Sequence, residues 1–129
     1  MAVADLNNSH EIITGNDNVV IVDNFQSIRG GRTLDTTGYA KPVINAGHVI
    51  IKETASGEYK PMPISGDSYS ALPEGHEYAG ILIASILTSK PLAGIMVRGT
   101  VNPAAAPFKM DTILSAVKAA LVLIDFRED

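Results

Sequence analysis

The chain has 129 residues, of which 46% are hydrophobic and 19% are charged, and its formal net charge is −4. This length predicts a single domain, and the negative charge argues against general nucleic-acid binding, which usually requires a basic stripe. The sequence contains no cysteine, which excludes disulfides, thiolate metal sites and a cysteine nucleophile. Because soluble domains carry about 25% charged residues, the lower fraction here predicts that other subunits cover part of the surface.

The N-terminal stretch, residues 1–18, is polar, rich in asparagine and aspartate, and interrupted by Gly15. It predicts a flexible arm with a short extended piece at Ile12 and Ile13. Two interpretations are open: a frayed terminus, or an arm that becomes ordered only on a partner. The stretch has no basic region followed by an apolar run, so we expect no signal peptide. The longest uncharged apolar run, Ala79–Ser89, is about half of the ~20 residues that a membrane-spanning helix requires, so we expect a soluble protein.

The next segment begins with a short β-branched run. Val19–Val22 is followed by Asp23-Asn24 and predicts a strand. Residues 24–38 contain three glycines and predict a long irregular connection. The pair Gly30-Gly31 could cradle a phosphate if a helix followed, but no helical pattern does, so no phosphate site is predicted.

Residues 48–62 carry the signals of a β-hairpin. The turn pair Ser56-Gly57 lies between the apolar residues Ile50-Ile51 and Tyr59. Prolines 61 and 63 restrict the second strand to a sheet edge or end it. The following stretch, residues 65–75, is rich in glycine, serine and proline and predicts a loop.

The most apolar part of the chain is Ala79–Asn102, which predicts the inner wall of the core. Its first half, Gly80–Leu87, is apolar at nearly every position, as in a strand covered on both faces. A corner at Ser89-Lys90-Pro91 separates it from a second strand, Ile95–Asn102, which alternates strictly. One face of this second strand is expected in the core, and the other, more polar face consists of Met96, Arg98, Thr100 and Asn102.

The C-terminal part predicts one short helix and a last strand. Asp111 is placed to cap the helix, because its carboxylate can accept the free amides of the first turn. Residues 113–121 carry one apolar stripe at helical spacing, and Leu121–Phe126 resembles a strand. The predicted architecture is therefore mainly β, with six to eight short strands in a small barrel or sandwich spanning residues 19–129.

Few residues in this sequence indicate chemistry. Carboxylates and an imidazole occur together only at Glu74, His76 and Glu77, whereas a metal site needs three or four ligands converging from a rigid frame. We interpret this cluster as a solvated turn. A swinging-arm carrier domain would need a lysine at a hairpin tip, and neither Lys52 nor Lys60 is so placed. The sequence therefore predicts no catalytic residue, no cofactor and no metal ligand.

The order of these signals resembles the head decoration proteins of tailed bacteriophages, the lambda-type decoration family and related head-fibre proteins. The resemblance covers residues 40–126 and differs from the compact lambda-type members in residues 16–37. In chain order, the features that carry it are Ala-Gly-x-Val-Ile at 46–50, Gly57–Pro61, Ala79–Leu82, Val97–Asn102 and the helix and strand of Asp111–Phe126.

The resemblance implies a β-tulip-like barrel that forms homotrimers, binds the major capsid protein at threefold sites on the outer capsid surface, and stabilises the head. It implies a virion protein made in the host cytoplasm, with an N-terminal arm that adds to a shell strand. The arm residues expected to contact the capsid are Ile12, Ile13, Val19 and Val20. The expected trimer contacts are Met96, Arg98 and Thr100. The alternatives are a base or attachment module of a head fibre or adhesin, using the loop 65–75, and a small β-barrel carrier or enzyme.

Overall fold

The computed structural model describes residues 14–128 and is mainly β. The main sheet has the strand order β1-β11-β8-β4-β5, and β12 also pairs with β11. Its strands are β1 (Ile21–Ser27), β4 (Val49–Glu53), β5 (Tyr59–Pro61), β8 (His76–Leu82), β11 (Ile95–Val101) and β12 (Ile124–Phe126).

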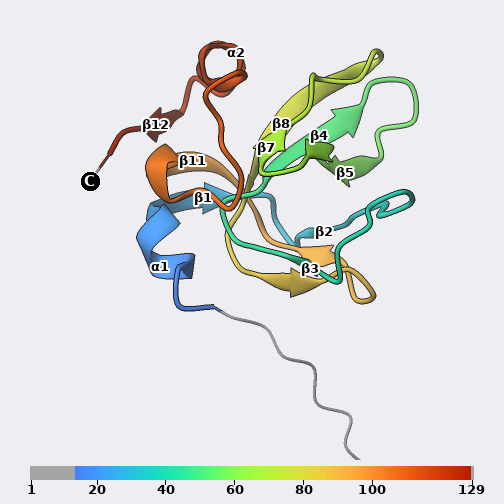
Figure 1. Ribbon diagram of the computed structural model, residues 1–129, viewed down its shortest axis with the longest axis horizontal. Coiled ribbons are helices and arrows are strands. Elements are labelled where there is room, and N and C mark those ends of the chain that lie inside the picture. The colour runs from blue at the N-terminus through green and yellow to red at the C-terminus, as the bar shows by residue number, and fades with distance from the viewer. Residues whose placement is uncertain (1–13, 129) are drawn as a thin grey trace, which may run out of the picture.

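Three small two-stranded sheets and three short helical segments complete the fold. The small sheets pair β2 (Arg32–Thr33) with β10 (Leu92–Ala93), β3 (Val43–Ile44) with β9 (Ile86–Leu87), and β6 (Ile64–Ser65) with β7 (Ser68–Tyr69). The helical segments are α1 (Asp17–Val20), the 3-10 turn η1 (Pro103–Ala105) and α2 (Leu114–Ala120). In Figure 1, α1, β1 and β12 lie on one side of the molecule, and β4, β5 and β8 extend toward the other.

Strand β11 is the centre of the main sheet. Antiparallel β1 pairs along one of its edges, while antiparallel β8 and parallel β12 share the other edge. The glycine at position 80 permits the close approach of β8 to β11, because a Cβ there would lie 2.5 Å from the Met96 carbonyl oxygen and from the side chain of Ile95. The identity of that residue is therefore set by strand packing.

The predicted hairpin over residues 48–62 is confirmed. Strands β4 and β5 pair antiparallel with Ile51 opposite Lys60, and Gly57 in the connecting turn has a φ of 77°, which glycine adopts without strain. β5 is an edge strand, so Pro61 disrupts no ladder on its outer side. The predicted loop 65–75 is only partly irregular, because its first residues form the β6–β7 hairpin.

Two apolar clusters cover the two faces of the main sheet. Along β4, Val49 and Ile51 belong to one cluster and Ile50 to the other. β11 follows the same rule, with Met96 on the first face and Ile95 on the second. The first face is covered by the C-terminal segment, which contributes Met110, Ile113, Val117, Leu121, Ile124 and Phe126. Alternation therefore marks two buried faces here, not one buried and one solvated face.

Several predicted boundaries are corrected by the structure. Val19–Val22 is not one strand, because α1 continues to Val20 and the strand β1 then extends through Ser27 into the predicted irregular connection. Gly80–Leu87 divides into β8, which ends at Leu82, and the separate strand β9. The helix α2 begins after Ile113 without a side-chain cap, so the cap predicted for Asp111 is wrong.

The main sheet is not closed into a barrel by strand pairing among residues 14–128. β1 and β5 are its two ends and are not paired with each other. The residues expected to form most of the N-terminal arm, 1–13, lie outside the described part of the chain, whereas Asp17 and Val20 are attached to the body of the domain.

Candidate functional site

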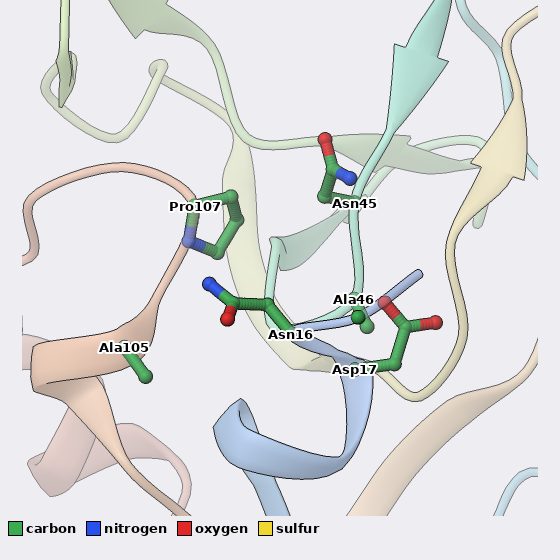
Figure 2. A pocket seen from close by; sticks show the side chains of 7 residues that line it. Asn16, Asp17, Asn45, Ala46, Ala105 and Pro107 are labelled. Carbon is green, nitrogen blue, oxygen red and sulfur yellow. The ribbon is translucent and has the colours of Figure 1, made fainter. Parts of the chain in front are cut away.

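An open pocket of about 450 Å³ lies where α1 meets the turn before β4 and the η1 segment. Three separate parts of the chain form its wall. Its lining residues are Gly15, Asn16, Asp17, Asn45, Ala46, Ala105 and Pro107. Figure 2 shows the Asn16 side chain extending toward Pro107, while the Asp17 carboxylate points the other way, beside Ala46.

The Asp17 carboxylate holds one side of this pocket in place. The Ser85 hydroxyl donates to Asp17 Oδ1 over 2.7 Å, and the Ser85 backbone N–H donates to Oδ2 over 3.0 Å. Ser85 Oγ in turn accepts the backbone N–H of Ala46 at 3.0 Å. One serine therefore joins α1 to the turn before β4, and hydrogen bonds to a charged acceptor are stronger than neutral ones.

The rest of α1 is fixed by packing and by the backbone. Val20 is buried, and a Cβ at Gly47 would collide with its side chain, so the turn before β4 lies directly against α1. The Val20 carbonyl accepts the N–H of Asn102 at 2.9 Å, and Asn102 Oδ1 accepts the N–H of Ala104 at the start of η1. These contacts and hydrogen bonds join the walls of the pocket to one another.

The chemistry of this pocket suits recognition. Its wall contains the side-chain amide of Asn16 and the apolar surfaces of two alanines and Pro107, while the amide of Asn45 lies against Ser85 Oγ at 3.4 Å. The carboxylate of Asp17 already accepts two hydrogen bonds from Ser85. Within residues 14–128, no group of three or more histidine, aspartate or glutamate side chains is placed to hold a metal ion. Mixed amide and apolar walls suit a peptide segment that inserts a small side chain and presents its backbone.

The predicted capsid-binding residues differ in their exposure to solvent. Ile12 and Ile13 lie outside the described residues. Val19 is 49% exposed and available to a partner, whereas Val20 is in the core. The prediction of Val20 as a capsid contact is therefore corrected: in a one-turn helix, only one of two consecutive valines faces outward.

The predicted trimer contacts are corrected in the same way. Met96 is fully buried in the apolar cluster that also contains residues of the C-terminal segment, and Thr100 is 7% exposed and lies opposite Asp125 of β12. Arg98 alone of the three is exposed, at the point where β11 pairs with Gln26 of β1.

A different set of side chains supplies exposed apolar surface. Six large hydrophobic residues in the described chain are exposed, and five of them lie on α1, on β1 or in the turn entering β12; β1 and β12 pair with opposite edges of β11. These five, named the apolar end, are Val19, Val22, Phe25, Val122 and Leu123. Phe25 is 69% exposed and Val122 is 77% exposed.

The cluster Glu74, His76 and Glu77 does not converge. Glu74 and Glu77 are exposed, and His76 Nδ1 lies 3.0 Å from the backbone carbonyl of Glu74. Lys52 lies within β4 over the ring of Tyr59, and Lys60 lies between the carboxylates of Asp35 and Glu53. Neither lysine occupies a hairpin tip, which agrees with the sequence-based argument.

The pairing of Asp17 with Ser85 was not predicted. The two residues are 68 positions apart, and each occurs in an unremarkable polar context. No local pattern could have joined them, because only the folded arrangement of α1 and the segment after β8 brings them together.

Comparison with protein-family models, with curated proteins and with solved structures finds no match. The helices in residues 14–128 are all too short to cross a membrane.

Proposed function

We propose that this protein is a structural component of a tailed-bacteriophage virion, a homotrimeric decoration protein on the outer surface of the head. In this proposal it binds the major capsid protein at threefold sites and stabilises the shell. The support from the sequence is the ordered resemblance across residues 40–126. The proposal includes no catalytic step, cofactor, nucleic acid or membrane. A mass measurement that found a group covalently attached to Lys52 or Lys60 would contradict it.

The structural observation that supports the proposal is that the residues following the N-terminal segment are held against the body of the domain. Residues 1–13 join the body at Thr14, next to the 450 Å³ pocket, and Asp17 holds that junction against Ser85. A capsid strand that pairs with this segment would be held close to an open recognition pocket. Three such segments on one trimer act at high effective concentration, so individually weak contacts suffice.

The apolar end, together with Arg98, is the proposed trimer surface. Exposed apolar groups gain from burial against another subunit, and arginine is enriched at such interfaces. The finer fold proposal is a β-tulip-like barrel. It is supported by the connection after β1, in which Ile28 donates to Ile95, Leu34 to Pro91, and Asp35 to Tyr59, so that backbone bonds lead from β11 toward β5.

The test of the subunit proposal compares two exposed apolar residues. Phe25 belongs to the apolar end, whereas Leu92, 63% exposed, lies on β10. Light scattering coupled to size exclusion should give three chains for the wild type and for Leu92→Asp, and single chains for Phe25→Asp and Arg98→Glu. A wild-type monomer, or a trimer unaffected by Phe25→Asp and Arg98→Glu, refutes the proposed surface.

The test of attachment deletes residues 1–13 and keeps Asp17. The truncated protein should retain its fold and trimeric state but sediment less with expanded phage heads. Equal binding of the truncated and complete proteins would remove the N-terminal segment from the mechanism.

The second candidate is the base or attachment module of a head fibre or adhesin. The observation that favours it is a second pocket bounded by Pro63 and Pro73, which flank most of the segment 65–75. Binding to a fibre partner that is lost when this segment is shortened, with head binding retained, would favour this candidate.

A further inference from the structure

The open pocket beside α1, about 450 Å³ in volume, is lined by an asparagine that does not cap the helix. Asn16 is exposed and occupies the N-cap position, where an asparagine side chain usually accepts a backbone N–H of the first turn. Here its backbone is helical and its side chain makes no capping hydrogen bond. Figure 2 shows this side chain extending toward Pro107 instead. The pocket is therefore lined by an accessible amide, which supplies both a donor and an acceptor.

The rest of the pocket favours an uncharged and partly apolar occupant. Asp17 is the one ionisable residue among those that line it, and Ser85 already donates two hydrogen bonds to the Asp17 carboxylate. The apolar part of the wall consists of Ala46, Ala105 and Pro107. The volume lies within the range of about 300–1,000 Å³ that holds organic ligands, so a short run of amino-acid residues fits.

The N-terminal segment ends beside this pocket. Residues 1–13 lie outside the described part of the chain and join the body through Thr14 to Gly15, which itself lines the pocket. A Cβ at Gly15 would have no atom within 4 Å, so there is space for the chain to turn back. Because the segment is covalently joined to the pocket wall, its effective concentration there reaches the millimolar range.

One stretch of the segment matches the walls in chemistry. Residues 6–9 read Leu-Asn-Asn-Ser and carry no charge, whereas Asp5 and Glu11 on either side are acidic. The leucine suits the apolar wall, and the asparagine amides can pair with another amide. Residues 2–4 offer no side-chain amide. The connection 10–14 can extend over about 17 Å and is longer than the roughly four residues of a reversing turn.

We propose that residues 6–9 of the same chain occupy this pocket in the free protein. Leu6 lies against Ala105 and Pro107, and an asparagine amide of the stretch pairs with Asn16. A contact with a Kd of about 1 mM is then filled about half of the time, because the linker is short. A second copy has no such covalent advantage. This docking is independent of the head-decoration function; on a phage head, a shell strand would have to displace the segment from the pocket.

The experiment uses the absence of cysteine from the chain. A nitroxide on Asp5→Cys in the full-length protein should broaden the NMR amide signals of Ala46 and Ala105. Adding Leu6→Asp should remove most of this broadening without affecting the fold, because Leu6 is outside the described domain. If the broadening is the same with and without Leu6→Asp, the proposal is overturned.

Two variants on α1 test the role of the pocket amide. Asn16→Ala should lower the ratio of docked to free segment by about five- to tenfold, the effect of one neutral hydrogen bond. The matched control Asn18→Ala is exposed on the same helix but does not line the pocket, and should leave the ratio unchanged. Equal effects of the two variants overturn the pairing with Asn16.

A mixed sample separates docking within one chain from docking between copies. Isotope-labelled protein without nitroxide is unfolded and refolded together with unlabelled protein that carries the nitroxide. The signals of Ala46 and Ala105 should stay sharp, because each segment occupies the pocket of its own chain. Broadening in this sample would assign the pocket to the segment of a second copy and overturn the proposal. The readout does not require a trimer or a phage head, so failure of the head-decoration function leaves it interpretable.

Discussion

Lowering the pH should weaken this fold through His48. The imidazole is completely buried, and the rings of Tyr39, Tyr69 and Phe108 lie edge-on to it at centroid distances of 5.1–5.6 Å. Its Nε2 donates to the Met62 carbonyl over 2.9 Å, while Nδ1 has no partner among residues 14–128. In the described part of the chain, no counter-ion is in contact with the ring to stabilise a positive charge.

Burial lowers the pKa of His48 from 6.5 to about 4, against the smaller opposite effect of the Met62 carbonyl. The folded state therefore binds fewer protons than the unfolded state between these two values. The contribution of the neutral His48 ring to the free energy of unfolding is fully present above pH 6.5 and is lost as the pH falls toward 4. The whole difference corresponds to about 3 kcal/mol of unfolding free energy, and about 2 kcal/mol of it is lost between pH 7 and pH 5.

The assay is urea unfolding at several pH values for the wild type and for His48→Gln. Glutamine can still donate to the Met62 carbonyl but does not titrate in this range. Subtracting the two pH profiles cancels the contribution of the carboxylates, and the remaining difference should decrease by about 2 kcal/mol from pH 7 to pH 5. Parallel profiles for the two proteins would refute the reasoning. In NMR titrations of the native protein, the His48 ring should remain neutral at pH 5; protonation near pH 6.5 would refute it independently.

Four further substitutions test the packing of β8 on β11, the Asp17–Ser85 anchor and the start of α2, each by chemical denaturation. Gly80→Ala should destabilise the fold by about 1–3 kcal/mol, since the added methyl group meets the Met96 carbonyl. The control Gly15→Ala, where a Cβ would have nothing within 4 Å, should change the free energy of unfolding by less than about 0.5 kcal/mol. Equal effects of the two substitutions would contradict the close approach of β8 and β11. Asp17→Ala should cost about 1–3 kcal/mol, because it leaves the Ser85 N–H and hydroxyl without their acceptor. Asp111→Ala should change stability by less than about 0.5 kcal/mol, because Asp111 does not cap α2; a loss near 1 kcal/mol would restore the capping role.

Local patterns predicted those parts of the fold that local forces determine. The β4–β5 hairpin follows from a turn glycine between two β-prone runs, and the edge position of Pro61 follows from its missing N–H. The last strand and the short helix before it were predicted from hydrophobic spacing, within a few residues of their observed limits.

The wrong predictions concern residues whose surroundings are formed by segments distant in the sequence. Met96 and Thr100 alternate with apolar residues, and alternation alone cannot reveal that Met96 packs in one cluster with residues of the C-terminal segment or that Thr100 lies opposite Asp125 of β12. Likewise, α1 is held by Ser85, so the polar composition before Val19 gave no indication of its attachment. Both pockets are lined by residues from separate parts of the chain, which sequence spacing could not bring together.

The central position of β11 has a consequence for the kinetics of folding. Its partner β1 comes from the beginning of the described chain and β12 from its end, with Ile21 and Phe126 both paired to Val101. The long sequence separation between β1 and β11 raises the contact order and slows folding, typically to milliseconds or seconds. At translation rates of about 5–20 residues per second, β1 emerges roughly 4–15 s before β11. During this interval the backbone of β1 has no partner strand, so its hydrogen-bonding edge remains unpaired.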